Sequence, residues 1–361
     1  MLLVSMGLRY IVNLHALNNE GSAGALTRVR RVPYIFIRKN GYKVREVNVV
    51  SGQSIAHAIQ EHLVELSVKA GLNVCENCKR YVFVKQGGEE YLSDSVKKVL
   101  SEIKDKLSKV SLKDKISLLE KAEKAILSNC VVEDVGGFMI AIKNYPNIRR
   151  ESSFKVSFLA PIMDEEFSEN VYIESLQFAR HEPATAVKKE EQEATEAAKK
   201  EEQEATERKE ASAQMIFVQE VAGGVYGIKL DLEVSKIGRA SISGFKKVLE
   251  DEEIKKRVDI TIEAIRRTLG WFQFGAKRSR FNPIEVLVEA VIVVSDGMSV
   301  ASPFVGDFYK ETLKRAEAYK KIGGFVEVFH YKLGGEKSFD EVLNEAKRLI
   351  LKKLEEELKA S

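Results

Sequence analysis

The stretch of sequence that decides the fold is Leu8-Arg9-Tyr10-Ile11-Val12-Asn13-Leu14-His15-Ala16-Leu17. Its side chains alternate in character along the chain. One face carries Leu8, Tyr10, Val12, Leu14 and Ala16, and the other carries Arg9, Asn13 and His15. Because successive side chains of a β-strand point to opposite faces of a sheet, this alternation predicts a strand that is buried on one face.

Further strands and helices follow along the chain. The segments predicted as strands are 32–37, 138–142, 153–160, 215–221, 226–234, 284–294 and 325–331, and glycine pairs such as Gly136-Gly137 and Gly223-Gly224 bound several of them. Apolar residues at helical spacing predict helices over 55–70, 96–107, 112–126, 258–269, 304–322 and 339–354. The sequence therefore predicts a chain of mixed α and β structure.

Length and composition indicate a globular protein. The chain has 361 residues, of which 44% are hydrophobic and 31% charged. No apolar run approaches the roughly 20 residues that span a bilayer. The apolar N-terminus meets Arg9 early and lacks a small-residue cleavage site, so no signal peptide is expected. An odd number of cysteines, three, is typical of a reducing compartment, and we expect a cytoplasmic protein.

The cysteine, histidine and glycine motifs indicate neither a metal site nor a nucleotide site. Cys75-Glu76-Asn77-Cys78 is a single C-x-x-C pair without a second pair or paired histidines at a usable spacing, so we expect a reduced pair in a loop and no metal. His57 and His62 are five residues apart, about 140° around a helix, which prevents them from sharing a metal. The sequence lacks a P-loop and a G-x-G-x-x-G following a strand, so no cofactor is expected.

Charge is strongly segregated along the chain, although the net charge is only +3. Arg28 to Arg45 holds seven basic residues and no acidic one, whereas residues 188–210 hold nine acidic and six basic residues. The acidic stretch contains Lys-Lys-Glu-Glu-Gln-Glu-Ala-Thr twice, eleven residues apart. Because this repeat has no apolar stripe to bury, we expect it to be an insertion outside the core.

Three segments suit nucleic acid. The first is the small and polar loop from Asn18 and Asn19 to Thr27, which leads into Arg28 and Arg30. In an extended segment these two arginines point the same way and reach successive phosphates, whose contacts dominate nucleic-acid affinity. The alternative is a solvated basic strand edge.

The second segment, Ser51-Gly52-Gln53-Ser54, directly precedes the helix predicted from residue 55. Hydroxyl groups and free backbone N–H groups meet at such a helix N-terminus, where phosphate binds readily. An ordinary N-cap explains the same residues equally well on local evidence. The basic run that precedes this segment favours phosphate binding.

The third segment runs from Trp271 through Phe272 and Phe274 to the Lys277-Arg278-Ser279-Arg280 loop. Aromatic rings that stack on bases and cations that neutralise phosphates are typical of proteins that bind single-stranded nucleic acid. Alone, the segment is only suggestive of RNA binding.

These segments, in this order, resemble the Cascade backbone subunit of type I CRISPR systems, in particular the archaeal type I-A branch of the DevR autoregulator family within the RAMP superfamily. The residues that carry the resemblance are 7–17, 18–24, Arg28-Val29-Arg30-Arg31-Val32-Pro33 and 50–57, supported by 274–283. The resemblance implies an α+β fold with an RRM-like (ferredoxin-like) palm, in one backbone-subunit domain over 1–361. It also implies a helical insertion at 55–128 and an extended thumb at 163–214 that includes the repeat at 188–210.

The implied function is a non-catalytic scaffold that oligomerises along CRISPR guide RNA and presents it for pairing with target DNA in antiviral defence. The implied partners are the guide RNA, target DNA through the guide, further copies of the chain and other Cascade subunits, with no membrane. The residues expected to contact RNA are Asn18, Asn19, Arg28, Arg30, Ser51, Gly52, Gln53, Ser54, His57, Lys277, Arg278 and Arg280. Because the aromatic pattern of ordinary RRM proteins is missing, base stacking on the sheet is not expected to dominate.

Three other interpretations remain at this stage. A RAMP-type endoribonuclease would use a divalent metal or histidines, of which the chain has five. Related type III subunits cleave RNA with an Asp in the loop after the first strand, and this loop has Glu20 but no Asp. A regulator of duplex DNA would need a basic recognition helix, which the sequence does not show. In the last interpretation, the basic loops serve only protein contacts.

Overall fold

A computed structural model describes residues 1–14, 17, 22–23, 26–27, 29–107, 110–164, 172–181, 214–275 and 282–360. Its strands are β1 (Leu3–Asn13), β2 (Ser22–Ala23), β3 (Leu26–Thr27), β4 (Arg31–Arg38), β5 (Gly41–Asn48), β6 (Phe138–Ile140), β7 (Ile148–Arg150), β8 (Phe154–Val156), β9 (Ala160–Pro161), β10 (Tyr172–His181), β11 (Gln214–Glu233), β12 (Arg239–Ala240), β13 (Lys246–Lys247), β14 (Glu285–Ser295) and β15 (Val326–Lys332). Its helices are α1 (Gly52–Lys69), α2 (Glu76–Lys79), α3 (Asp94–Leu107), α4 (Leu112–Asn129), α5 (Val131–Gly136), α8 (Asp251–Ile265), α9 (Phe308–Lys321) and α10 (Phe339–Lys359), with shorter turns η1 (Glu89–Tyr91), η4 (Val234–Lys236), η5 (Ser241–Ser243) and the π-helical η6 (Arg266–Gly270).

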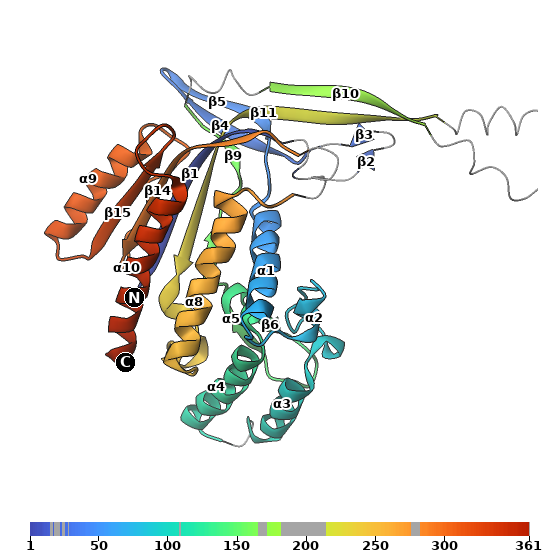
Figure 1. The fold of residues 1–361 in the computed structure, drawn as a ribbon. Helices are drawn as coiled ribbons and strands as arrows, with labels where there is room; N and C mark the ends of the chain where they lie inside the picture. The colour runs from blue at the N-terminus through green and yellow to red at the C-terminus, as the bar shows by residue number, and fades with distance from the viewer. Residues whose placement is uncertain are drawn as a thin grey trace, which may run out of the picture.

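The main sheet is built around β1, as the alternating stretch predicts (Figure 1). β1 pairs antiparallel with β14 on one edge and with β11 on the other, and β15 extends the sheet beyond β14. The far edge of β11 pairs antiparallel with β8, then β9, then β10, from its carboxyl end towards its amino end. The mixed α and β prediction is therefore confirmed, with an antiparallel sheet at its centre.

Two strand boundaries differ from the sequence prediction. β1 begins at Leu3, five residues before the alternation, because residues 3–8 are buried on both faces. The strands predicted on either side of Gly223-Gly224 are one strand, β11. Gly223 pairs with Asn13 of β1 and with Tyr172 of β10, so partners on both edges hold the glycine pair in the sheet.

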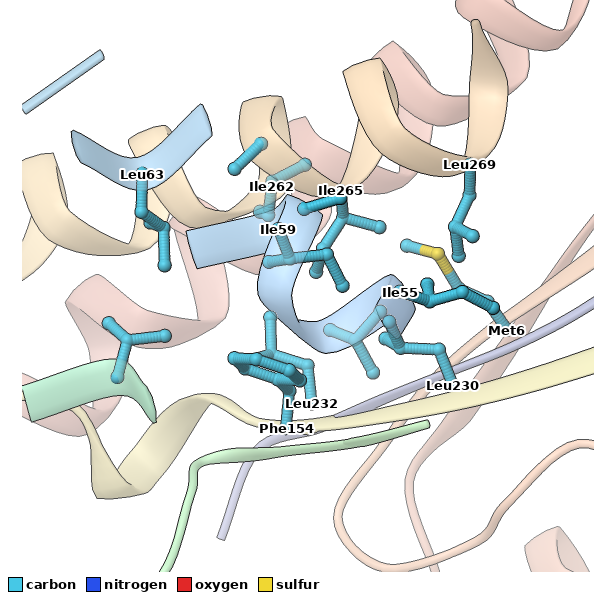
Figure 2. Packing of buried hydrophobic residues seen from close by; sticks show 14 of the residues in the cluster. Met6, Ile55, Ile59, Leu63, Phe154, Leu230, Leu232, Ile262, Ile265 and Leu269 are labelled. Atoms are coloured by element: carbon cyan, nitrogen blue, oxygen red, sulfur yellow. The ribbon is translucent and has the colours of Figure 1, made fainter. Parts of the chain in front are cut away.

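Helices cover both faces of the sheet. Figure 2 shows Ile55, Ile59 and Leu63 of α1 against Ile262, Ile265 and Leu269 of the α8–η6 segment, with Met6, Phe154, Leu230 and Leu232 beneath them. Alternate residues of β14 divide between the two sides. Ala290 and Ile292 join this core with α8 and α10, while Val291 and Val293 pack with Phe308 of α9 on the opposite face.

A separate lobe of α2, α3 and α4 lies next to the lower half of α1 (Figure 1). Apolar side chains of α3 and α4 form a second core, in which Val96, Leu100 and Ile126 are fully buried, whereas Cys78 of α2 belongs to the main core. The lobe meets the rest of the protein through α5 and through buried ion pairs. Arg150 contacts Glu123 of α4 at 3.1 Å and Asp134 of α5 at 2.7 Å, and Asp134 also contacts Arg257 of α8 at 2.8 Å.

The hairpin of β4 and β5 packs on the body through one of its faces. Phe36 and Val47 are buried in a small cluster with Val49 and Ala160. Among the described residues, no helix is long and apolar enough to cross a membrane.

Candidate nucleic-acid interface

The helix α1 begins at Gly52, three residues before the predicted start at residue 55, so Gly52, Gln53 and Ser54 form its first turn. The Ser51 side chain is buried and its Oγ accepts a hydrogen bond from the Ser54 backbone N–H at 3.1 Å, so Ser51 is the N-cap. The preceding residue, Val50, exchanges two backbone hydrogen bonds with Leu159, each 3.0 Å long. These contacts determine where the helix begins and which way its first turn faces.

The first turn of α1 is tightly placed against the chain beside it. A Cβ atom added at Gly52 would lie 2.6 Å from the carbonyl oxygen of Val156 and 3.0 Å from that of Ser157, so only glycine fits here without a shift. The next residue, Gln53, is exposed, and Ser54 is half-buried. A polar side chain therefore reaches solvent beside the helix N-terminus.

Arg30 lies beside this helix start. Its backbone carbonyl accepts a hydrogen bond from Val49 at 2.9 Å, two residues before the N-cap, and its side chain is half-buried. Arg30 precedes β4 directly, and Arg31 pairs with Asn48 at the far end of the hairpin. The fold thus brings together two of the segments singled out in the sequence: the one that contains Arg30, and the N-terminus of α1.

His57 lies one turn beyond Gln53 on α1, on the same side of the helix. Its side chain is 51% exposed, and its Nε2 lies 3.4 Å from the Glu61 carboxylate. Its ring meets the Phe83 ring edge-on, with 4.9 Å between centroids. His57 is therefore positioned at the surface that also carries Gln53.

The aromatic residues of the third segment have a structural role. Phe272 and Phe274 are 2% and 5% exposed, and the Phe272 ring lies 5.2 Å from that of Tyr10. Trp271 is partly exposed, and its indole N–H donates to Asp340. The prediction that these phenylalanines stack on bases is wrong, because both rings are buried in the main core together with residues of β1, α1 and α8.

The ends of the two predicted loops lie side by side. The Asn13 N–H, at the end of β1, donates to the Ile284 carbonyl at 3.1 Å, just after the Lys/Arg loop. The neighbouring Leu14 N–H donates to Ala222 of β11 at 2.7 Å. Both loops therefore leave the sheet at one end. Asn18, Asn19, Arg28, Lys277, Arg278 and Arg280 lie outside the described residues.

Sequence reasoning missed the hairpin itself. The sequence pattern predicts one strand within the basic run from Arg28 to Arg45, whereas β4 and β5 fold this run into a hairpin. The Asn40-Gly41 pair is the signal that would have revealed it, because Asn-Gly favours tight hairpin turns. The outer face of the hairpin carries exposed apolar residues, among them Ile35, Tyr42 and Val44 at 52%, 78% and 65% exposure.

The histidines bear on the alternative of an endoribonuclease. In the part of the chain where side chains are described, three histidines each have a different partner. His57 pairs with Glu61, His62 lies 3.0 Å from the Gln273 carbonyl, and His330 lies 2.9 Å from Glu289. These described histidines therefore do not form a pair suited to general acid and base catalysis.

Comparison with known proteins gives consistent results. Residues 6–315 match the profile of a family described as the CRISPR-associated negative auto-regulator DevR/Csa2. CRISPR-associated protein Cas7/Csa2 1 of Saccharolobus solfataricus is 30% identical over 311 residues, which cover 85% of this chain and 83% of the relative. CRISPR-associated aCascade subunit Cas7/Csa2 2 of the same organism is 29% identical, covering 89% of this chain and 88% of the relative.

Structural comparison extends over nearly the whole chain. A chain of a CRISPR RNA-guided surveillance complex in a pre-nicking state matches with a TM-score of 0.52 at 9% sequence identity. The match covers 96% of this chain and 100% of that chain. The similarity is therefore one of fold.

Proposed function

The chain belongs to the CRISPR-associated DevR/Csa2 family, and on that basis we propose that it is a backbone subunit of a type I-A Cascade complex. In this role it binds CRISPR guide RNA through the sugar-phosphate backbone and leaves the bases free to pair with target DNA. Its partners are the guide, further copies of itself along the guide and other Cascade subunits. The relative named an aCascade subunit supports this assignment.

We propose that the main sheet and its helices are the RRM-like palm. The chain runs from β1 through α1 to the β8–β10 edge, then through β11 and α8 to β14. The strands lie in the order β14, β1, β11 and then β8 to β10, all antiparallel. This is the connection order of a ferredoxin-like unit, βαββαβ, with β15 added at one edge.

The insertion expected at 55–128 starts within α1, but Ile55, Ile59 and Leu63 of α1 belong to the main core. We therefore propose that α1 belongs to the palm and that the insertion is limited to α2, α3 and α4. The thumb is proposed at 163–214. Within it, β10 pairs with the first half of β11, and both strands extend away from the palm in Figure 1.

The observation that carries the RNA-binding proposal is the backbone hydrogen bond between Arg30 and Val49. It holds Arg30 beside the N-terminus of α1. An arginine side chain and a helix N-terminus are two different groups that bind phosphate, and here they lie together. The first N–H groups of a helix lack partners within the helix and lie at its positive end, so they attract phosphate. Ser51 caps Ser54, and the helix itself supplies no partner for the N–H groups of Gly52 and Gln53.

The proposal is tested by reversing charge at this interface. The double variant Arg28→Glu, Arg30→Glu is compared with wild type in filter-binding titrations of unstructured RNA at low salt. We expect at least a tenfold loss of affinity, since two phosphate contacts become repulsive. Unchanged affinity in the double variant would contradict the proposal.

A matched control is Arg315→Glu on α9. Arg315 is half-exposed beside Glu311 and lies on the helix that covers the opposite face of the sheet. Reversing the charge of Arg315 lowers the net charge by two units but removes no proposed phosphate contact. RNA affinity is therefore expected to stay within about twofold of wild type. The same preparations, incubated with labelled RNA and divalent metal, should leave the RNA intact, because the proposed subunit is non-catalytic.

A further inference from the structure

Three buried cysteines from distant parts of the chain meet at the base of the α2–α4 lobe. Cys75 is the N-cap of α2, Cys78 lies within α2, and Cys130 joins α4 to α5. Their sulfur atoms all lie within 4.8 Å of one another. The sequence prediction of a cysteine pair in a loop is wrong, because α2 forms there and Cys130 packs against it.

Backbone and side-chain hydrogen bonds bring Cys130 to the pair. The Val131 N–H donates to the Asn73 carbonyl at 3.0 Å, and the Asn73 side chain donates to the Ser128 carbonyl at 3.0 Å. These two bonds join the segment before Cys75 to both sides of Cys130. The cluster is therefore fixed by the fold on both sides.

A buried carboxylate completes the group. Glu133 lies in the first turn of α5, is 1% exposed, and has its Oε1 3.9 Å from the Cys75 sulfur. The Gln86 side-chain amide donates to both of its carboxylate oxygens, at 2.8 and 2.9 Å. Ionising a carboxyl group that is buried beside three thiols is costly unless a cation shares the site.

We propose that Cys75, Cys78, Cys130 and Glu133 bind one Zn²⁺ ion with tetrahedral geometry. Zinc binds thiolate sulfur at about 2.3 Å, so tetrahedral ligands lie roughly 3.8 Å apart. The three sulfur atoms reach this geometry with small side-chain movements. Glu133, whose Oε1 lies 3.9 Å from the Cys75 sulfur, takes the fourth position after its side chain shifts towards the other two sulfurs. A C-x-x-C pair followed by a distant third cysteine is also a common arrangement at structural zinc sites.

The surroundings suit a bound metal. The Cys75 sulfur accepts hydrogen bonds from the backbone N–H groups of Asn77 and Cys78, as the ligands of metal sites are commonly held by surrounding hydrogen bonds. Gln86 orients Glu133 through its amide, as partners of metal ligands do. Lys85 and Gln86 both have positive φ, 52° and 64°. Residues other than glycine rarely adopt this backbone conformation, and those that do are often found at functional sites.

Charge and protons balance without any redox step. Each of the three thiols, and the Glu133 carboxyl group where it is protonated, releases a proton to solvent as it binds the cation. The four ligands then carry two more negative charges than Zn²⁺ neutralises. Lys85 lies close enough to interact electrostatically with Cys78, Cys130 and Glu133, so its ammonium group offsets part of this excess.

The proposed ion has a structural role. Four protein ligands leave no open position for a substrate, as in closed structural zinc sites. Cys75 and Cys130 lie where the chain enters and leaves the lobe of α2, α3 and α4, so the metal joins the two ends of that lobe. The metal then holds α2 to α5 at the base of the lobe (Figure 1).

The test measures metal in the full-length protein. The chain is purified untagged from zinc-supplemented cells without chelator, and zinc, iron and copper are measured by mass spectrometry. We expect about one zinc per chain, consistent with a single four-ligand site. Co²⁺ exchanged into the protein should show the visible and near-ultraviolet absorption of a tetrahedral thiolate complex.

Variants distinguish ligand loss from loss of stability. Cys130→Ser should lower the zinc content to below about a tenth of wild type, and Glu133→Gln should retain the cobalt thiolate bands while weakening zinc against a competing chelator at least tenfold. Ile126→Val, a mild change in the core of the same lobe, serves as the matched control and should keep full zinc content.

Two results would overturn the proposal. One is wild-type protein that lacks zinc even after incubation with Zn²⁺ under reducing conditions and shows no cobalt thiolate absorption. The other is a disulfide between Cys75 and Cys78 in protein purified anaerobically, found by mass spectrometry with no metal bound. Neither result bears on RNA binding, which is tested separately.

Discussion

At the scale of single residues, the protein depends on a few buried charges. Asp134 lies between two guanidinium groups, Arg150 at 2.7 Å and Arg257 at 2.8 Å, and its oxygens also accept the Gly238 N–H. All three charged side chains are almost fully buried. Because buried charges are stable only when paired, this one carboxylate joins α5, α8 and the segment after β11.

We expect Asp134→Ala to be strongly destabilising. It leaves Arg257 and Arg150 buried with fewer partners, which costs roughly 3–5 kcal/mol of unfolding free energy. Urea denaturation followed by circular dichroism measures the change. The matched control is Asp251→Asn, whose carboxylate pairs with Lys247 at 2.8 Å while 44% exposed, and its effect should stay below about 1 kcal/mol. Similar losses for both variants would refute the importance of burial.

At the scale of elements, α1 has two functions. Its apolar side packs on the sheet and on α8, while its N-terminus and exposed side carry Gln53 and His57. A single helix thus couples the core to the proposed RNA-binding surface. A change in the packing of α1 is therefore expected to affect the interface as well as stability.

Ile59→Ala tests this coupling. Ile59 is fully buried between α8 and the sheet, so truncation should cost roughly 2–5 kcal/mol of unfolding free energy. On the same helix, Val68 is 52% exposed, and Val68→Ala should change stability by less than about 0.5 kcal/mol. Thermal and urea unfolding of both variants measure the difference. An equally small effect at Ile59 would show that α1 is not held by this core.

At the scale of the whole molecule, the arrangement of cationic segments matters more than the net charge of +3. The ends of both basic loops leave the sheet at the end of β1, and the arginine strand joins the N-terminus of α1. A guide RNA that follows this surface would place several of its successive phosphates against the cationic segments of one protein chain. Binding through phosphates weakens steeply as salt concentration rises.

The salt dependence of binding provides a quantitative test. A plot of log affinity against log salt concentration should be linear, and each phosphate contact on a single strand contributes about 0.7 to its slope. Arg30→Ala is therefore expected to reduce the slope by roughly 0.7, while Arg315→Ala leaves it unchanged. An unchanged slope for Arg30→Ala would mean that Arg30 does not contact a phosphate.

Much of the fold could be predicted from the sequence. The 32–37 strand and the helices over 96–107, 112–126 and 339–354 are confirmed within a few residues, because a regular apolar pattern reports which side of an element is buried. The Ser51 cap was also predictable, since it depends on neighbours three residues away. The hairpin turn at Asn40-Gly41 also has a local sequence signal, because Asn-Gly favours tight turns.

By itself, then, the sequence determined the periodic elements, the helix caps and the segregation of charge, all of which depend on residues close together in the chain. Only the tertiary structure decided which distant residues meet. It joined Cys130 to Cys75 and Cys78, and it buried Phe272 and Phe274 in the core. The physical reason is that burial depends on the sum of many long-range contacts, which a local pattern of residue types does not specify.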